Sequence, residues 1–149
     1  MPGASRAFAD TNLFLRFLTQ DPPEQAAAAE ATLRQAEAGE LMLVTTPLVF
    51  AELAWTLRSF YGRTQGEIAQ TLLALLNTPG LEVEASDRLI QAVVWFEEKN
   101  VDFIDAYHAA WLLEQSFSEV VTFDRKHFGR FAHLRVTVPG REDGEDETT

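Results

Sequence analysis

Short apolar runs alternate with longer amphipathic stretches along the chain, and this alternation is typical of an α/β domain with a largely parallel sheet. Residues 6–9 and 41–44 predict the first two strands, the second of them buried. In residues 81–84 apolar and acidic positions alternate, which predicts a strand near a sheet edge. Residues 120–123 predict a central strand, and residues 134–138 predict a last, shorter one.

Start and stop signals bound the helical stretches between these strands. Asp21-Pro22 predicts a helix start, with Asp as the N-cap and Pro in the first turn, and Gly39 predicts the end of that helix. Residues 64–67 have the spacing of a capping box, and Pro79-Gly80 closes the helix that follows. The helical stretches expected are 13–18, 21–38, 46–60, 64–76, 86–99 and, beginning at 101 or 102, a last one to 115.

The length and composition fit one folded domain. Of 149 residues, 46% are hydrophobic and 23% are charged, a balance that belongs to a globular protein. We expect a single domain over residues 1–139 and an acidic, disordered tail over residues 140–149. The chain has no cysteine, which excludes disulfides, thiolate metal sites and a cysteine nucleophile. It shows neither a signal peptide nor an apolar run of membrane-spanning length, so we expect a cytoplasmic protein without membrane contact.

The charge of the chain is strongly negative. The formal net charge is −11, from 12 Lys and Arg against 23 Asp and Glu. A basic stripe, which would be the strongest sequence sign of polynucleotide binding, is absent. This charge argues against a non-specific DNA binder, and it leaves room for an enzyme that contacts a few phosphates through a metal ion and scattered arginines.

Four acidic residues stand where an ordinary soluble core would not place them. Asp10 and Asp124 each follow a short apolar run, and Glu52 and Asp105 each interrupt an apolar helical pattern. Ligands in parallel α/β sheets bind beyond the carboxyl ends of the strands, which is where Asp10 and Asp124 would lie. Glu52 has no Lys or Arg three or four residues away along its helix. We therefore expect these four acids to form one carboxylate pocket.

Each of these residues also has a simpler interpretation. Asp10 and Asp124 could be N-caps, and Glu52 could be exposed by chance. Asp102 and Asp105, near a helix start, suit the helix dipole, although Asp105 lies past the first turn of the predicted helix. Asn12 could orient a carboxylate or a metal-bound water, or it could be a turn residue. The three histidines have no partner at metal-binding spacing, so His108 is expected to be a hydrogen-bonded helix residue and His127 and His133 to be surface residues.

A cluster of carboxylates needs a compensating cation. Two unit charges about 5 Å apart repel by roughly 3 kcal/mol at an effective dielectric constant near 20, and a cluster of four costs several times that. Protonation relieves part of this repulsion, and a hard dication relieves it better. A site of oxygen ligands alone suits Mg²⁺, with Mn²⁺ as a substitute. Such a site can activate a water and hold phosphate oxygens, which is the chemistry of metal-assisted phosphodiester hydrolysis.

Four segments in order resemble a PIN domain, and more narrowly the VapC-type toxins of bacterial type II toxin–antitoxin pairs. The segments are residues 10–12 (DTN), 50–53 (FAEL), 101–106 (VDFIDA) and 121–125 (VTFDR). The resemblance spans about residues 6–138. It implies a three-layer α/β/α fold with a central, mostly parallel sheet of four to five strands. It also implies a Mg²⁺-dependent endoribonuclease with an RNA substrate, a VapB-like antitoxin as partner and usually a homodimer.

The resemblance also implies roles for individual residues. Asp10 and Asp105 would be the main metal ligands, Glu52 would complete the pocket, and Asp124 would be the fourth acid. Asn12, Asp102 and Thr122 would be supporting neighbours. Many relatives carry a further acid soon after the fourth, whereas here Arg125 and Lys126 follow it. This difference weakens the case for a second metal ion that would need an acid there. Arg125 and Lys126 could instead contact RNA phosphates.

Other functions were weighed against this one. A phosphatase of the haloacid-dehalogenase type needs a second Asp two residues after the first, and position 12 is Asn. A PIN-like module that binds a partner and cuts nothing remains the alternative, and the surplus of negative charge supports it mildly. A dimer is also expected because residues 48–60 and 68–76 carry more apolar surface than one sheet can cover.

Overall fold

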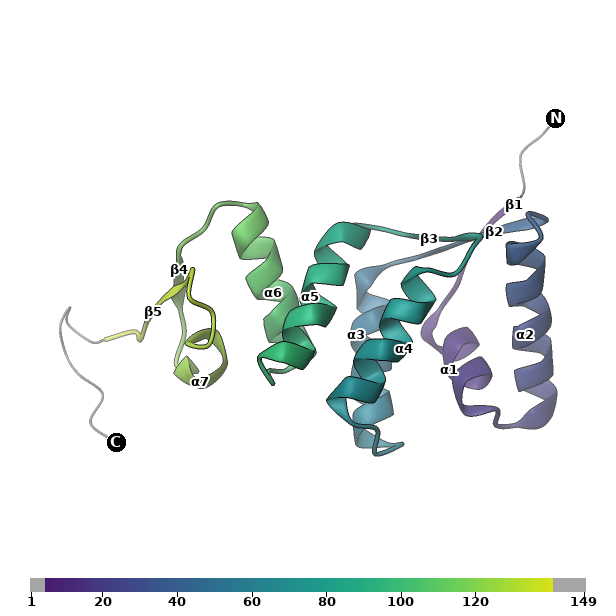
Figure 1. Ribbon diagram of the computed structural model, residues 1–149, viewed down its shortest axis with the longest axis horizontal. Coiled ribbons are helices and arrows are strands. Elements are labelled where there is room, and N and C mark those ends of the chain that lie inside the picture. The colour runs from purple at the N-terminus through teal and green to yellow at the C-terminus, as the bar shows by residue number, and fades with distance from the viewer. Residues whose placement is uncertain (1–4, 141–149) are drawn as a thin grey trace.

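The computed structural model describes residues 5–140, and Figure 1 shows an elongated molecule with helices and strands in alternation. The predicted tail lies outside the described residues, except for Gly140. The expectation of one domain over residues 1–139 stays a prediction. Within the described part of the chain, no helix is long and apolar enough to cross a membrane.

The strands and helices follow the sequence pattern closely. The strands are β1 (Ser5–Phe8), β2 (Leu41–Thr45), β3 (Leu81–Val83), β4 (Glu119–Val121) and β5 (Arg135–Thr137). The helices are α1 (Thr11–Thr19), α2 (Pro23–Glu37), α3 (Pro47–Ser59), α4 (Gln65–Leu76), α5 (Ser86–Glu98), α6 (Phe103–Glu114) and α7 (Arg125–Phe128). The short helix α7 was not predicted, and the other six helices were.

Local signals account for most of these boundaries. The capping box at α4 is complete, because the Thr64 hydroxyl accepts from the Glu67 N–H and the Glu67 carboxylate accepts from the Thr64 N–H, each at 3.1 Å. The N-cap of α2 is Pro22 rather than the expected Asp21, and it makes no side-chain cap bond. Gly80, with φ of 79°, lies against α2, where an added Cβ would overlap the carbonyl group of Ala36. Only glycine fits at this turn before β3.

All strand pairs are parallel, as predicted, but they form two sheets instead of one. One sheet has three strands in the order β1-β2-β3, and the other pairs β4 with β5. The predicted edge strand β3 does lie at an edge. The prediction of one sheet with four to five strands is therefore wrong in its count, while the α/β class is confirmed.

The prediction that residues 120–123 form a central strand is also wrong. The strand found there, β4, has a neighbour on one side within the described residues, and Val121 and Phe123 are 65% and 80% exposed. The apolar run signals burial on both sides, but nothing in the described part of the chain covers the second side.

The hydrophobic core lies mainly among the helices, and within the described residues Leu43 of β2 is the one buried apolar side chain that a strand contributes. Figure 1 shows the three-stranded sheet with α1–α4 at one end, α5 and α6 in the middle, and β4, β5 and α7 at the other end. Helix α5 packs against both α4 and α6, and α6 also contacts α3. The largest fully buried apolar side chains come from both ends of the chain: Phe14, Phe50, Leu53, Ile68, Leu72, Leu89, Val93, Val101 and Phe131.

Candidate carboxylate–histidine site

Asp105 and His127 form the centre of the site. Asp105 lies in the first turn of α6, and His127 lies in α7, so the two come from separate segments of the chain. The Nδ1 atom of His127 is 2.8 Å from Oδ2 of Asp105. Both side chains are about four-fifths buried, with exposed fractions of 21% for His127 and 20% for Asp105. The contact is thus shielded from solvent more than an ordinary surface pair.

Helix α7 presents its histidine to the acids because of the way it begins. Asp124 is its N-cap, with Oδ1 accepting from the Lys126 N–H at 3.1 Å. The Thr122 hydroxyl accepts in turn from the Asp124 N–H at 3.0 Å. The other carboxylate oxygen of Asp124 lies 3.3 Å from His127 Nδ1. Thr122 therefore supports Asp124 through a hydrogen bond. One oxygen of the Asp124 carboxylate caps the first turn of α7, and the other lies beside the imidazole of His127.

Asp102 adds a third carboxylate. It is the N-cap residue of α6 but makes no side-chain cap bond, and its Oδ2 lies 3.8 Å from His127 Nδ1. Its side chain is 73% exposed. Three carboxylates thus surround one imidazole nitrogen, which carries at most one proton and can donate it to one oxygen at a time.

The electrostatics of the site follow from this crowding. Burial raises the pKa of Asp105 above its ordinary value, and the negative charges of Asp102 and Asp124 raise it further. The hydrogen bond and charge of His127 act in the opposite direction on this pKa. An acid whose charge is disfavoured by burial and by two like charges gains most from a nearby cation.

The donor set fits a divalent metal ion. One ligand atom each from Asp102, Asp105 and His127 lies within 4.8 Å of the others, and among residues 5–140 this is the one group of three or more such side chains so close together. The set contains an imidazole nitrogen, which was not predicted from the sequence. Carboxylates with an imidazole suit Mn²⁺ as well as Mg²⁺, since nitrogen ligands favour transition metals.

Asp10 and Glu52 lie apart from this group. Asp10 is the N-cap of α1, with Oδ1 accepting from the Leu13 N–H at 3.3 Å. Glu52 is exposed on α3. Together with Asn12 they line a hollow of about 380 Å³ next to the carboxyl end of β1. The structure therefore brings Asp10 and Glu52 into one group and Asp102, Asp105 and Asp124 into another, and it does not join all four predicted acids.

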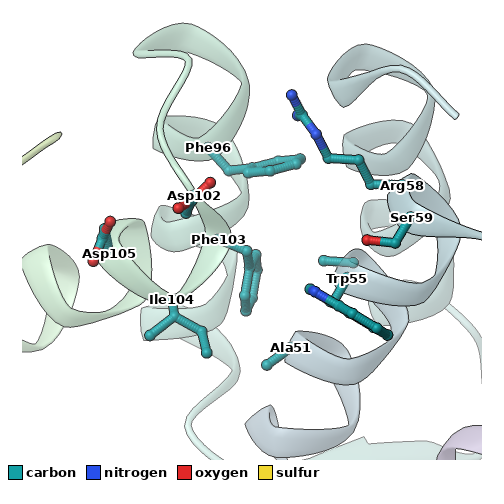
Figure 2. Close-up of a pocket in the computed structure, with 10 residues that line it drawn as sticks. Ala51, Trp55, Arg58, Ser59, Phe96, Asp102, Phe103, Ile104 and Asp105 are labelled. Atoms are coloured by element: carbon teal, nitrogen blue, oxygen red, sulfur yellow. The ribbon is translucent and has the colours of Figure 1, made fainter. Parts of the chain in front are cut away.

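A second hollow, of about 510 Å³, lies between α3 and α6. Figure 2 shows Phe103 and Ile104 on the side of α6 that faces α3, with Asp105 on the side turned away from Trp55. Asp102 reaches the edge of this hollow, and Arg58 of α3 lines the opposite wall. Arg58 brings a positive charge to the hollow that Asp102 and Asp105 also line, and this was not predicted from the sequence.

The expectation that His127 and His133 are surface residues is wrong. His127 joins the acids, and the signal for this was its spacing of three residues from Asp124, which places both on one side of a short helix. His133 is partly buried, stacks on Trp95 with ring centroids 5.4 Å apart, and has a buried Nε2 atom without a hydrogen-bond partner. Arg125 and Lys126 lie in α7 directly after Asp124, Arg125 half-buried and Lys126 exposed.

The protein is an α/β domain with parallel strands joined by helices. Its carboxylate site lies where α6 and α7 begin. The sequence profile of the PIN domain family matches residues 7–134. The chain belongs to the PIN domain family. PIN domains are generally nucleases, which are hydrolases, and they generally use divalent metal ions.

None of the curated proteins matches the chain significantly. One of the solved structures that match the chain is that of VapBC2 from Rickettsia felis bound to a DNA fragment from its promoter. The two chains share 14% sequence identity over 89% of this chain and 98% of the other, with a TM-score of 0.36.

Proposed function

We propose that the protein is a divalent-metal-dependent endoribonuclease and acts as the toxin of a type II toxin–antitoxin pair, as VapC-type proteins do. The observation that supports this most is the convergence of Asp102, Asp105 and Asp124 on His127 in a PIN-domain chain. Four sequence segments that resemble VapC-type toxins support the narrower assignment. The substrate is RNA, and the ion is Mg²⁺ or Mn²⁺.

Some residues of the site would bind the ion, and others orient the side chains that bind it. Asp105 and Asp102 would hold the ion, and His127 would either join them through a ring nitrogen or fix Asp105 through the contact at 2.8 Å. A bound ion would supply a Lewis acid for phosphate oxygens and would lower the pKa of a water. Asp124 orients His127, and Thr122 orients Asp124. Asp10 and Glu52, with Asn12 beside them, form the second group of acids, which lies apart from the first.

The positive residues around the acids are the candidate contacts for RNA. Lys126 and Arg125 follow Asp124 directly, and Arg58 lines the neighbouring hollow. In a chain with a net charge of −11, these local cations would place the phosphates of the substrate near the acids. Sequence-specific contacts would depend on the shape of the groove and on unpaired bases.

A VapB-like antitoxin is the proposed partner. Helix α3 leaves Leu48, Trp55 and Phe60 between 64% and 75% exposed, although they are large apolar side chains. The rings of Trp55 and Phe60 contact each other edge to face, so these two exposed side chains form one continuous apolar surface. Exposed apolar surface of this kind is typical of interaction sites, and an antitoxin segment on α3 would also cover the hollow beside Asp102.

A catalytically inert PIN-like binding module is the second candidate. The separation of Asp10 and Glu52 from the other acids favours it, because neither group alone contains all four predicted acids. The two candidates differ in one measurable property. The nuclease cleaves RNA only with a divalent ion, and the module does not cleave.

The test is cleavage of a labelled single-stranded RNA by the purified protein, with Mg²⁺, Mn²⁺ or EDTA. We expect cleavage with either ion and none with EDTA. Asp105→Asn should lower the rate at least about 100-fold, since it removes a ligand charge. Asp87→Asn, at an exposed acid in the first turn of α5, is the matched control and should cleave as the wild type does. Equal cleavage by the wild type and Asp105→Asn, both folded by circular dichroism, would reject the proposal.

A further inference from the structure

The hollow between α3 and α6 has an aromatic side chain on each of its two walls. Trp55 of α3 lines one wall and is 64% exposed, and Phe103 of α6 lines the other. Phe96 of α5 also lines the hollow and contacts Phe103 edge to face, with the ring centroids 6.0 Å apart. Figure 2 shows the rings of Trp55 and Phe103 on opposite sides of this space. A planar ring that enters the hollow would therefore have an aromatic face to stack on.

A positive charge lies in the same hollow. Arg58 follows Trp55 by three residues on α3, is exposed, and lines the hollow. Among residues 5–140 no hydrogen bond or ion pair reaches its guanidinium group. In a chain with a net charge of −11, a guanidinium without an acidic partner is unusual. Its fork of N–H donors fits the oxygens of a phosphate group.

The hollow shares two residues with the carboxylate–histidine site. Asp102 and Asp105 line the hollow from α6, and both belong to the group that, with His127, could hold a divalent ion. A phosphate bound to that ion would lie on the α6 side of the hollow, and a second phosphate could reach Arg58 on the α3 side. The two walls together thus offer two phosphate contacts with an aromatic surface between them.

We propose that this hollow binds one unpaired nucleotide of single-stranded RNA, with its base stacked on Trp55 and a neighbouring phosphate at Arg58. Bases in a duplex are stacked on their neighbours, so an unpaired base is needed to offer its face to Trp55. Stacking of this kind tolerates every base, so the contact selects single strands more than a particular sequence. The choice of RNA as the ligand rests on the proposed nuclease function, whereas the contacts for a base and a phosphate follow from the lining of the hollow.

The charges favour a nucleotide over a protein segment as the occupant. An apolar helix would cover the aromatic walls, but it would also remove Arg58, Asp102 and Asp105 from water without giving them partners. A nucleotide supplies a ring for the aromatic walls and phosphates for the guanidinium and the bound ion. An antitoxin segment on α3 would exclude this nucleotide, because both would contact Trp55.

The test is nuclear magnetic resonance of the isotope-labelled protein with Mg²⁺ and each of the four ribonucleoside monophosphates at millimolar concentration. A mononucleotide contains no phosphodiester bond, so the readout does not depend on cleavage. The chain has three tryptophans, and Trp55→Phe identifies the indole N–H signal of Trp55 by its loss. We expect at least one nucleotide to shift this signal in a saturable way. Ribose phosphate, which lacks the base, should leave the signal in place.

The matched control is present in the same spectrum. Trp111 is 38% exposed on α6, stacks on Phe117 and does not line the hollow. Its indole N–H signal should not move with any nucleotide. Equal shifts of Trp55 and Trp111 would mean unspecific stacking on exposed indoles and would overturn the proposal.

Two variants test the separate contacts to the base and the phosphate. The backbone N–H signal of Ile104, which also lines the hollow, measures the affinity of each variant. Trp55→Ala should lower the affinity for the nucleotide at least about 5-fold, because it removes the stacked ring. Arg58→Gln should lower the nucleotide affinity about 5-fold and leave that of the nucleoside, which has no phosphate, unchanged. Arg63→Gln, at an exposed arginine outside the hollow, is the matched control and should bind both as the wild type does.

Two further outcomes would overturn the proposal. If all four nucleotides leave the Trp55 signal in place, the hollow does not bind a nucleotide and is left to a protein partner. If the signal moves with protein concentration alone, a second copy of the chain covers the hollow.

This proposal and the nuclease function fail separately. If the wild type cleaves RNA but no nucleotide shifts the Trp55 signal, the nucleotide site is rejected and the nuclease function stands. If nucleotides bind at Trp55 but the wild type cleaves no RNA, the nuclease function fails and the hollow is the nucleotide site of a module that does not cleave.

Discussion

The imidazole of His127 and the carboxylate of Asp105 meet at 2.8 Å, although 22 positions separate them in the sequence. This contact joins the start of α6 to the short helix α7, and it anchors a group of three carboxylates around one nitrogen atom. The chemistry proposed for the protein depends on this group.

His127 should strengthen metal binding. His127→Gln keeps a polar side chain but loses the imidazole that contacts Asp105, so the affinity for Mn²⁺ should fall about 10-fold to 100-fold. Isothermal titration calorimetry of the metal-free protein measures this change. His108→Gln, at an exposed position on α6, is the matched control and should bind Mn²⁺ as the wild type does. If both variants keep the wild-type affinity, His127 is not part of a metal site.

Asp105 should make the metal-free protein less stable as the pH rises. Burial raises its pKa in the folded state, so the folded state holds this proton more tightly than the unfolded state, where an Asp titrates near about 3.9. The stabilising effect of the proton is present below that value and is lost as the pH rises through the raised pKa. Asp105→Asn should therefore melt at a higher temperature than the wild type at pH 7.

The pH dependence itself is the check on this prediction. Thermal unfolding in EDTA should show the advantage of Asp105→Asn shrinking as the pH falls through the raised pKa, and disappearing below about 3.9, where the carboxyl is protonated in both the folded and the unfolded state. Addition of Mn²⁺ should raise the melting temperature of the wild type more than that of the variant, since the ion binds the folded state. A constant difference between the two proteins at every pH would contradict the assigned cause.

Lys126 should contribute to RNA binding through a phosphate. Its side chain is exposed beside Asp124, and removal of one phosphate contact lowers the slope of log affinity against log salt by about 0.7 for a single strand. We expect Lys126→Ala to weaken RNA binding, with the difference shrinking as salt increases. Fluorescence anisotropy in the Asp105→Asn background measures binding without cleavage. Arg34→Ala, at a side chain 74% exposed on α2, should leave the affinity unchanged.

Gly80 should be needed for folding, and Gly39 less so. Both have positive φ, 79° and 82°, so alanine at either position costs about 1–2 kcal/mol of backbone strain. At Gly39 an added Cβ meets open space, whereas at Gly80 it overlaps the Ala36 carbonyl group. Gly80→Ala should therefore lose at least about 3 kcal/mol of unfolding free energy, and Gly39→Ala about 1 kcal/mol. Urea denaturation of both variants tests this, and equal losses would contradict the steric explanation.

Much of the fold could be predicted because its signals are local. Apolar periodicity and capping residues such as Thr64 act within a few positions, so six of the seven helices and all five strands were predicted near their observed places. The caps at Asp10 and Asp124 were foreseen as alternatives for the same reason, and both form. Helix α7 was missed because four residues carry too little periodicity to recognise.

The site could be predicted only in part. The sequence identified Asp105 as an acid out of place in an apolar helix, but it did not indicate that His127 would contact it. The contact depends on how α7 turns after Asp124, which is a tertiary arrangement. Glu52 interrupts an apolar helical pattern, and the structure shows it exposed, because α3 buries the side that carries Leu53, Ala54 and Leu57.

The sequence by itself determined the α/β class, the parallel strands and the four acids, since hydrophobic periodicity and residue chemistry depend only on each residue and its near neighbours in the sequence. Only the tertiary structure decided which acids meet, that a histidine lies among them, and that β1 and β4 each have a neighbouring strand on one side only among residues 5–140. The reason is physical: a strand's apolar pattern specifies that it will be covered, whereas the neighbour that covers it is chosen by the packing of whole helices such as α5 and α6.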